Sequence, residues 1–366
     1  MNKTNLEKIK VAIVYDRVNK FGGAERILLT LQEMFPTAPL YTSVYDEKNA
    51  PWAKVFPKVY TSFLQNIPFA KSNHELFGWL MPIAFEGFDF REYDLVISVT
   101  SEAAKGIITN TNTPHVCYML TPTRYLWSGY DEYFESSILK FISNPILNYL
   151  KWWDKVASTR PDKIIAISTE VQKRIKKYYG RESEIIFPPV NLVANTQKSI
   201  INNNYYLYVG RLVKYKKVDL LVDTFNELKL PLVIVGVGSE LNKLKLESKN
   251  NIKFLGNISD EELVKIYQNA LGFLMPQDED FGITSVEAQS FGIPVIAYKS
   301  GGALDTVIDG ITGIFFEKQD KESLKQAISK FDNLSFNSGY LVTNAKRFGK
   351  DRFKKELFDC INKNIK

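Results

Sequence analysis

The repeated alternation between short apolar runs and helical patterns most constrains what this chain can fold into. Four runs in the N-terminal half are predicted to be strands: Ile9–Tyr15, which is rich in Val and Ile, Tyr93–Val99, Val116–Leu120 and Lys163–Ile167. A helix is predicted after the last of them, over Thr169–Tyr179, with Ser168 as its N-cap and Gly180 as its stop. Strands that alternate with helices predict a mostly parallel sheet covered by helices.

A second alternating series follows an aperiodic stretch. This stretch comprises Phe187–Val190 and the polar segment Asn191–Asn204, which show neither helical nor strand periodicity. It is therefore predicted to be a linker. Beyond it, the predicted strands are Tyr205–Val209, Leu232–Val235, Ile252–Leu255, Leu271–Met275, Val295–Ala297 and Gly313–Phe316. The predicted helices between and after them are Lys217–Leu228, Glu240–Glu247, a helix capped by Ser259 and Glu262, Ile283–Phe291 and a last helix over about Asn344–Asn362.

The chain length fits two domains, because 366 residues exceed the size at which one hydrophobic core stops growing. We expect two Rossmann-like, doubly wound α/β domains, residues 1–190 and 191–343, and a C-terminal helix, residues 344–366, that packs back on the first domain. Ligands of such sheets bind outside the carboxyl ends of the strands. If the two sheets face each other, the site is the cleft between them.

Composition argues against several classes of function. The net charge of +6 is divided evenly between the two halves of the chain, so a nucleic-acid-binding face is not indicated. The two histidines are too few for a histidine-based metal site, and Cys117 and Cys360 lack metal-ligand spacing. The first ten residues are polar, unlike a secretory signal, and no apolar run approaches the ~20 residues of a transmembrane helix. We therefore expect a cytoplasmic protein.

The strongest candidate site is the segment Pro276–Thr284, with Glu287 one turn into the next predicted helix. A helix N-terminus offers unpaired amides and the positive end of a dipole to a diphosphate. In that geometry Glu287 could accept hydrogen bonds from two ribose hydroxyls, and Glu279 could hold the hydroxyls of a sugar. Two glutamates at this spacing also arise by chance on a protein surface, so the residues alone leave both interpretations open.

This stretch resembles the E-x7-E motif of the retaining glycosyltransferases of family 4. Arg211, in Gly210–Leu212 at the end of a predicted strand, and Lys216 resemble the diphosphate-binding pair of that family. The resemblance implies a GT-B architecture, in which two Rossmann-like domains face each other across a cleft. It also implies that Arg211 and Lys216 stabilise the diphosphate leaving group, while Glu279 orients the sugar. Arg211 would contribute a rigid, planar guanidinium and Lys216 an ammonium on a flexible side chain.

Several further segments resemble the donor site of the same family. Val235–Ser239 is similar to its glycine turn, Phe254–Gly256 to the segment that passes the nucleobase, and Gly22–Arg26 to its glycine-rich loop. Leu241 stands where a dinucleotide fingerprint needs its third glycine, which disfavours a dehydrogenase. The resemblance thus implies these donor-binding residues: Gly22, Gly23, Gly210, Gly238, Leu255, Phe281, Gly282, Ile283, Thr284 and Glu287.

The segment Thr121–Trp127 resembles a branch of the family that includes mannosyltransferases of bacterial O-antigen and capsule assembly. The likeness implies GDP-mannose as the donor and places Arg124 and Tyr125, together with Asp16, in the acceptor or sugar region. Relatives commonly carry a histidine directly before this Thr-Pro, whereas this chain has Leu120, and His115 does not replace it. UDP sugars therefore remain open as donors.

The resemblance also implies a reaction without a metal or other cofactor. Asp278–Asp280 has the D-x-D form that binds a divalent metal in another glycosyltransferase architecture, but here the basic pair and the helix dipole replace the metal. No carboxylate is placed as a nucleophile on the opposite face of the sugar. The resemblance implies a same-face reaction in which the departing diphosphate helps to deprotonate the acceptor hydroxyl.

Two features leave the acceptor side open. Phe63–Phe90 and Phe141–Trp153 are dense in aromatic residues, which suits either core packing or a peripheral membrane face that collects a polyprenyl-linked glycan. The basic run Lys173–Lys177 suits a solvated helix or contact with anionic lipids. Two other functions also remain open: a nucleotide-sugar epimerase on the same fold, and a non-catalytic protein that binds nucleotide sugars or glycans.

Overall fold

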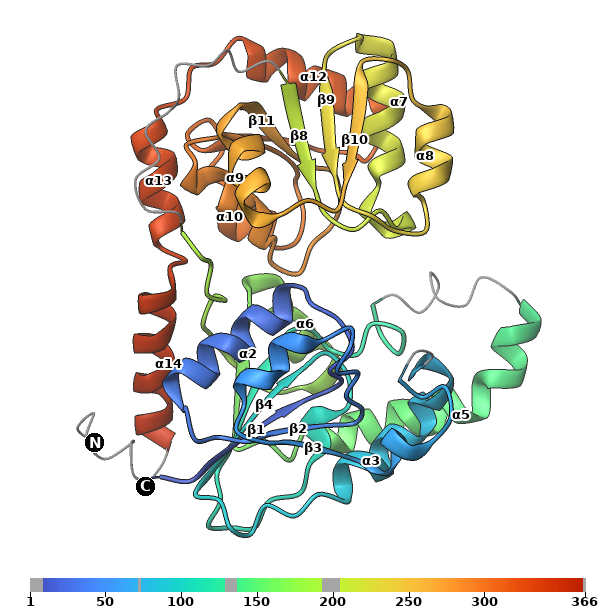
Figure 1. Cartoon of the computed structure of the whole chain (residues 1–366), viewed down its shortest axis with the longest axis vertical. Coiled ribbons are helices and arrows are strands. Elements are labelled where there is room, and N and C mark those ends of the chain that lie inside the picture. The colour runs from blue at the N-terminus through green and yellow to red at the C-terminus, as the bar shows by residue number, and fades with distance from the viewer. Residues whose placement is uncertain (1–8, 72–73, 129–136, 193–204, 365–366) are drawn as a thin grey trace. The chain divides into compact units, whose positions relative to one another are not determined.

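The structure, a computed structural model, describes residues 9–71, 74–128, 137–192 and 205–364 (Figure 1). The chain divides into two compact units. Unit 1 comprises Met1–Pro189 and Phe353–Lys366, and unit 2 comprises Val190–Arg352. The first boundary lies one residue before the expected one, whereas the return to unit 1 comes at Phe353, later than the expected residue 344.

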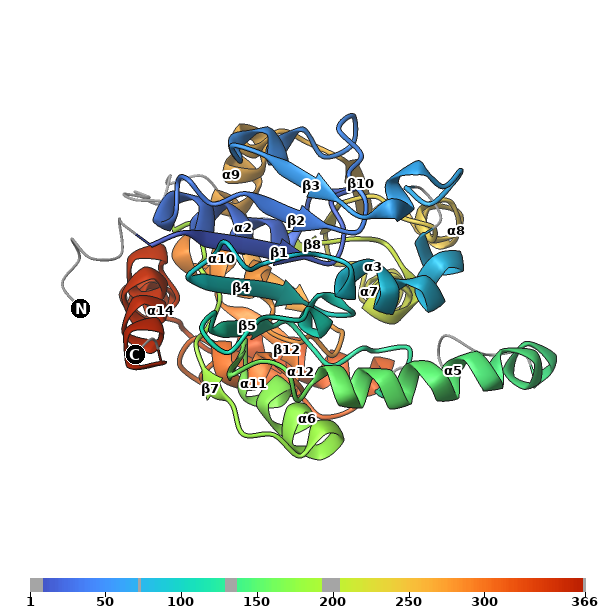
Figure 2. The same ribbon diagram turned by 90° about the horizontal axis from the view of Figure 1, so that it is seen from below.

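Unit 1 is built on a seven-stranded parallel sheet in the order β3-β2-β1-β4-β5-β6-β7, part of which Figure 2 shows from β3 to β5. Its strands are β1 Val11–Tyr15, β2 Leu40–Thr42, β3 Val59–Thr61, β4 Leu95–Thr100, β5 His115–Met119, β6 Lys163–Ala166 and β7 Glu184–Ile185. The central strands β1, β4 and β5 are buried along their whole length, as parallel strands covered on both faces must be. All four strands predicted in this half are confirmed.

The helices of unit 1 are α2 Gly23–Met34, α3 Met81–Glu86, α5 Ser137–Ala157, α6 Thr169–Tyr179 and most of α14 Lys350–Asn364, with short 3₁₀ helices η1 Pro51–Val55, η2 Phe63–Asn66, η3 His74–Leu80 and η4 Ala104–Gly106. Helix α6 has the predicted ends. The Ser168 hydroxyl accepts a hydrogen bond from the amide of Val171 at 3.1 Å, and Gly180 ends the helix with φ +67°.

Unit 2 is built on a six-stranded parallel sheet in the order β10-β9-β8-β11-β12-β13. Its strands are β8 Tyr205–Val209, β9 Leu232–Val235, β10 Ile252–Gly256, β11 Ala270–Met275, β12 Val295–Tyr298 and β13 Gly313–Phe316. Its helices are η5 Lys214–Lys216, α7 Val218–Leu228, α8 Leu241–Glu247, α9 Asp260–Gln268, α10 Ile283–Ser290, α11 Ala303–Thr306, α12 Lys321–Asp332 and α13 Ser338–Lys346. The doubly wound sheet is confirmed, as is the capping box at Ser259 and Glu262.

The single helix predicted over Asn344–Asn362 is wrong, because two helices, α13 and α14, meet there. The carbonyl of Phe348, between them, accepts a hydrogen bond from the amide of Val190 at 2.9 Å instead of continuing a helix. Beyond this break, Phe353 is buried against Tyr118, and Lys354 pairs with Glu33 at 2.7 Å. The last residues of the chain therefore pack on unit 1.

Each sheet reverses its strand order once. In unit 1 the chain runs from β1 outwards to β3 and then returns to β4 on the other side of β1; in unit 2 it runs from β8 to β10 and returns to β11. The connections that leave β1 and β4, or β8 and β11, therefore diverge to opposite faces of the sheet. Such a reversal opens a crevice at the carboxyl ends of the two strands, where open α/β sheets bind their ligands.

Backbone segments meet closely at the carboxyl edge of the unit 2 sheet. Gly236, directly after β9, has φ +137°, and a Cβ atom there would lie 1.9 Å from the carbonyl oxygen of Gly210 after β8. The amide of Gly236 also donates to the carbonyl of Gly256 at 2.8 Å. Gly256 itself has φ +67° but open space where a side chain would stand. Of these two glycines, Gly236 is thus the one that a direct contact between two backbones requires.

Replacing Gly236 by alanine is expected to lower the free energy of unfolding of unit 2 by about 3 kcal/mol or more, because the two backbones must separate. The same substitution at Gly256 should cost only about 1 kcal/mol, the strain of a left-handed residue. Native-state hydrogen exchange of the amides in β8 and β9 measures both losses in the full chain. Equal losses in the two variants would contradict the close backbone approach.

Candidate active site

The strand reversal in unit 2 brings together two of the predicted catalytic residues. Lys216, in η5 after β8, forms an ion pair with Glu279, in the loop after β11. Their side chains are only 12% and 20% exposed. The side-chain amide of Gln277, itself buried, donates to the same Glu279 oxygen at 2.8 Å. A carboxylate with these two donors is held in one orientation at the carboxyl edge of the sheet.

Arg211 lies in the same loop as Lys216 and is exposed. Its Nη2 atom donates to the hydroxyl of Tyr215 at 2.6 Å, and its guanidinium carbon lies 5.9 Å from the Tyr215 ring centroid. The Lys216 ammonium lies 5.1 Å from the centroid of the same ring. Tyr215 thus lies within reach of both cations. The sequence interpretation missed Tyr215, although an aromatic residue between two predicted phosphate ligands was a readable signal.

Two consecutive glycines fix the loop that carries Glu279. The amide of Gly302, after β12, donates to the Glu279 carbonyl at 2.7 Å. A Cβ atom on Gly302 would lie 2.2 Å from the Cα of Phe281, and one on Gly301 would lie 2.2 Å from the Glu279 carbonyl oxygen. These contacts leave room only for hydrogen, so the Gly-Gly pair is what lets the loops after β11 and β12 meet.

Helix α10 begins beside Glu279. Gly282 is its N-cap, with φ +89° and no side-chain cap, and Ile283 and Thr284 are half-buried residues of its first turn. The helix has no acidic residue in that turn, so its amides present an uncompensated positive dipole end. Glu287, one turn later, is 9% exposed, and the hydroxyl of Tyr267 lies 3.4 Å from its Oε2 atom.

The remaining unit 2 residues that are predicted to bind the donor differ in how exposed they are. Leu255, near the end of β10, is 39% exposed, which leaves it available to a flat ligand such as a base. Gly238 packs its backbone against that of Leu212, whose carbonyl oxygen would lie 2.2 Å from an added Cβ. Phe281, by contrast, is buried and packs edge-on against Phe348 with centroids 5.4 Å apart. Its side chain belongs to the core, so any donor contact at this position would come from its backbone.

The strand reversal in unit 1 is occupied by Asp16, which follows β1 and is 2% exposed. Its carboxylate accepts hydrogen bonds from the four successive amides of residues 101–104, at 2.7 to 3.1 Å, and from the Thr100 hydroxyl at 2.9 Å. Burial and the nearby Glu102 carboxylate raise the pKa of Asp16, and the backbone amides act in the opposite direction. These contacts hold the loop after β4, and the placement of Asp16 in the acceptor or sugar region stays a prediction.

Arg17 and Glu102 join the same two loops, with Arg17 Nη1 and Glu102 Oε2 2.5 Å apart. Gly22 and Gly23 lie close by in sequence, as the N-cap and first residue of α2. Glu25 in that helix is buried and accepts a hydrogen bond from the Tyr15 hydroxyl at 2.8 Å. Gly22 and Gly23 thus lie at the start of α2, which the hydrogen bond between Tyr15 and Glu25 joins to the end of β1.

Arg124 and Tyr125 lie after β5, in a half-buried loop. Burial raises the pKa of the Tyr125 hydroxyl well above its ordinary value, so this group stays protonated at neutral pH. Leu120, where the family resemblance implies a histidine, is also half-buried. His115 lies at the other end of β5, fully buried, with Nε2 2.7 Å from the Ser98 hydroxyl. Burial, and to a lesser extent Arg160, lowers the pKa of His115 to about 3, which makes it a neutral core residue.

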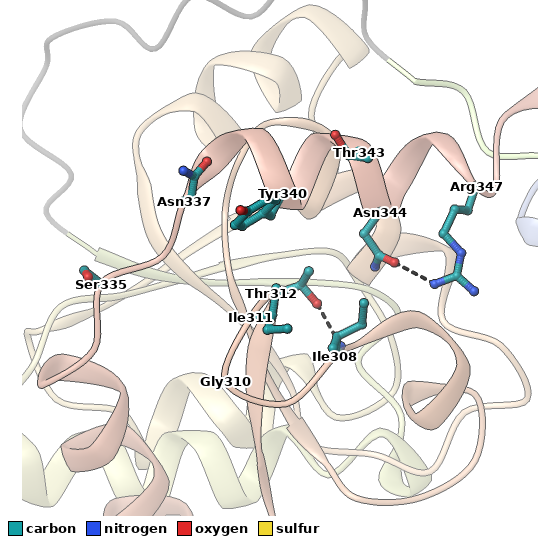
Figure 3. Close-up of a pocket in the computed structure, with 10 residues that line it drawn as sticks. All are labelled: Ile308, Gly310, Ile311, Thr312, Ser335, Asn337, Tyr340, Thr343, Asn344 and Arg347. Atoms are coloured by element: carbon teal, nitrogen blue, oxygen red, sulfur yellow. Dashed lines mark hydrogen bonds between the residues drawn. The ribbon is translucent and has the colours of Figure 1, made fainter.

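A cavity of about 570 Å³ lies elsewhere in unit 2, between the loop Ile308–Thr312 and helix α13 (Figure 3). Arg347 stands at one end of it and donates from Nη1 to Asn344 Oδ1 at 2.9 Å. The loop directly precedes β13, so the cavity lies toward the amino edge of the sheet, opposite the edge that carries the motifs. None of the predicted site residues is among those that line it.

Within the described parts of the chain, no three His, Cys, Asp or Glu side chains converge into a metal site. The helices of those same parts include none that is both long and apolar enough to cross a membrane.

Comparison with known proteins places this geometry in a family. Residues 194–348 match the family described as Glycosyl transferases group 1. This part of the chain, most of unit 2, is similar to the group 1 glycosyltransferases. The matched residues contain Arg211, Lys216, Glu279 and Glu287, the residues of the unit 2 crevice. The family resemblance read from the sequence is therefore confirmed, while the role of each residue stays a prediction.

Two curated relatives illustrate the similarity. An uncharacterized glycosyltransferase of Methanocaldococcus jannaschii is 30% identical over 209 residues, which cover 55% of this chain and 58% of that protein. The O-antigen chain mannosyltransferase C of Escherichia coli is 25% identical over 216 residues, 55% of this chain and 57% of that protein. The chain thus spans little more than half the length of these relatives.

A solved structure shows the fold over nearly the whole chain. The Anabaena protein HepE in complex with UDP-glucose has a TM-score of 0.70 at 19% identity and covers 96% of this chain and 99% of its own. The predicted GT-B fold is confirmed.

Proposed function

We propose that this chain is a retaining glycosyltransferase that moves a hexose from a nucleoside diphosphate sugar to an acceptor hydroxyl. The observation that carries the proposal is the ion pair between Lys216 and Glu279, which lies at the strand reversal of unit 2 beside Arg211. A cation for the diphosphate and a carboxylate for the sugar hydroxyls are needed next to each other, because the bond that breaks joins those two parts of the donor. The match of residues 194–348 to the group 1 family supports the same activity.

Each residue has a separate task in the proposed reaction. Arg211 and Lys216 balance the charge that develops on the diphosphate as its bond to the anomeric carbon breaks. The acceptor oxygen bonds to that carbon on the same face, and its proton passes to an oxygen of the departing diphosphate. Glu279, held by Lys216 and Gln277, is an orienting hydrogen-bond acceptor rather than a nucleophile. Glu287 anchors the ribose.

GDP-mannose is the donor that we propose, supported by the segment Thr121–Trp127 and by the similarity to an O-antigen mannosyltransferase. UDP sugars are the competing donors, since the similar Anabaena structure holds UDP-glucose. A thermal-shift panel of GDP, UDP and ADP separates them, because a ligand at 100 times its Kd stabilises by about 2.7 kcal/mol.

A surface-polysaccharide glycan on a polyprenyl carrier is the acceptor that we propose, reached through peripheral contact of unit 1 with the inner surface of the membrane. Helix α5 supports this contact because it is apolar on two sides. One side is buried: Leu147, Leu150 and Trp153. Other apolar side chains, at helical spacing, are 38% to 63% exposed: Ile146, Tyr149, Trp152 and Val156. An exposed apolar stripe with neighbouring lysines, Lys151 and Lys155, suits an anionic membrane surface.

One observation favours a different function. Leu120 stands where relatives carry a histidine near the transferred sugar, which is compatible with a protein that binds nucleotide sugars or glycans without transfer. An epimerase on the same fold is less well supported, since the only described histidine near this region, His115, is a neutral core residue. Mass spectrometry of the products formed from donors and lipid extracts distinguishes the three functions.

Replacing Arg211 by alanine or Lys216 by methionine is expected to lower kcat by about 100-fold or more, as for the loss of a preorganised charge stabiliser. Lys214→Ala, which removes a cation from the same turn, is the control and should retain nearly normal turnover. Turnover of nucleotide-sugar donors is measured in excess chelator, and product NMR gives the anomeric configuration. A near-normal rate in Arg211→Ala, an inverted product, or a loss of activity restored by manganese would each contradict the proposed mechanism.

The double variant Tyr149→Ser, Trp152→Ser is expected to bind vesicles of anionic phospholipid at least about 10-fold more weakly than the unaltered chain. Each large apolar side chain that leaves water contributes about 1.5–3 kcal/mol. Leu246→Ser in α8 removes an 87% exposed apolar side chain from unit 2 and should leave binding unchanged. Co-sedimentation measures the three proteins. Equal binding by all of them would exclude α5 as the membrane face.

A further inference from the structure

A fully buried ion pair in unit 1 has no part in the proposed reaction. Lys105, in η4 after β4, and Asp154, on α5, lie with Nζ and Oδ1 2.5 Å apart, and their side chains are 1% and 2% exposed. Removing two charges from water costs several kcal/mol per ion, and a pair in the interior offsets that cost only with good geometry and further hydrogen bonds. The hydrogen bonds that Lys105 and Asp154 make to neighbouring loops therefore indicate the structural role of the pair.

Asp154 holds the loop after β5 at two points. Its Oδ1 atom accepts from the Thr123 hydroxyl at 2.7 Å, and its Oδ2 atom accepts from Trp127 Nε1 at 2.8 Å and from the Tyr179 hydroxyl at 2.7 Å. Thr123 and Trp127 flank Arg124 and Tyr125, the residues predicted to face the acceptor or sugar. The conformation of this pair of residues is thus set from both sides by one carboxylate.

Lys105 ties a second loop to the same carboxylate. Its ammonium donates to the carbonyl of Glu102 and lies 3.3 Å from the Thr123 hydroxyl. Glu102 in turn pairs with Arg17 after β1. The loops after β1, β4 and β5, which follow three neighbouring strands at the carboxyl edge of the unit 1 sheet, are therefore linked through Lys105 and Asp154 to helix α5.

The surrounding packing leaves these loops little room to shift. A cavity of only about 10 Å³ lies among Thr123, Tyr125 and Asp154 and the neighbouring residues of η3 and α3. On the other side, the Trp127 ring stacks on Tyr178 with centroids 5.2 Å apart. A loop held by two hydrogen bonds, an ion pair and a stacked ring has one well-defined conformation.

We propose that Lys105 and Asp154 are positioning residues for the acceptor side of the reaction, acting through the loop that carries Arg124 and Tyr125. The inference rests on the proposed glycosyltransferase function. Apolar residues of similar size commonly stabilise an interior as well as a buried ion pair does. The specific contribution of this pair is thus the geometry that it imposes on the loop rather than stability.

The test is the double variant Lys105→Met, Asp154→Leu of the full chain, which replaces the pair without leaving a buried charge. Its affinity for the nucleoside diphosphate, bound in unit 2, should match that of the unaltered chain. Its thermal unfolding midpoint should fall, because Thr123, Trp127 and Tyr179 lose their common acceptor. Its kcat/KM for the acceptor should fall by about 100-fold, the scale of a misplacement of about 1 Å. Transfer at the normal rate by a folded double variant would overturn the inference.

Single variants of the loop keep the test decisive if the double variant does not fold. Thr123→Val removes the hydroxyl that meets Asp154 and Lys105, and Thr123→Ser restores it. Loss of acceptor kcat/KM in the valine variant, with recovery in the serine variant and unchanged nucleotide affinity in both, supports a positioning role. Equal rates in the two variants would refute it. Absence of transfer by the unaltered chain itself would contradict the proposed function instead, so the two failures are distinguishable.

Discussion

The reversal of strand order in each sheet is the constraint on which the rest of the structure depends. It opens a gap at the carboxyl edge between β8 and β11 in unit 2 and between β1 and β4 in unit 1. In each unit one ion pair joins the two loops beside the gap: Lys216 with Glu279, and Arg17 with Glu102. Both pairs are mostly buried, so the cost of removing their charges from water offsets much of their attraction. What they set is the position of charged groups at the place where an open α/β sheet binds ligands.

The loops can meet at this edge only because glycine lets backbones touch. Gly236 lies against Gly210, and Gly302 lies against the segment of Glu279 and Phe281. The first contact shapes the basic loop and the second shapes the acidic loop. Lys216 and Glu279 then join the two halves of the unit 2 edge. Unit 1 uses a different device, because buried carboxylates, Asp16 and Asp154, hold its loops through backbone and side-chain donors.

Local signals account for what could be predicted from the sequence. Helix α6 was predictable to the residue because both of its ends are marked within its own segment, by Ser168 and Gly180. Strands β2 and β3 have three residues each, too few for a recognisable period. The break between α13 and α14 depends on a hydrogen bond from Val190 to Phe348, far away in the sequence. No local pattern could show that contact.

The same distinction holds for the candidate site. The motif around Arg211 and Glu279 is local and was visible, whereas the pairing of Lys105 with Asp154 joins distant segments and was not. The family resemblance placed Asp16 in the acceptor or sugar region, whereas its hydrogen bonds to the amides of residues 101–104 are visible only in the fold. A sequence shows which groups reach the carboxyl edge, and the fold decides which of them remain available to a ligand.

The most direct measurement of the central claim is a crystal structure of the full chain with a nucleoside diphosphate sugar. The account predicts the diphosphate at the β8/β11 reversal, with oxygens within about 3 Å of the Lys216 ammonium or the Arg211 guanidinium, and a sugar hydroxyl donating to Glu279. A nucleotide bound instead in the cavity beside α13, at the opposite edge of the sheet, would contradict it.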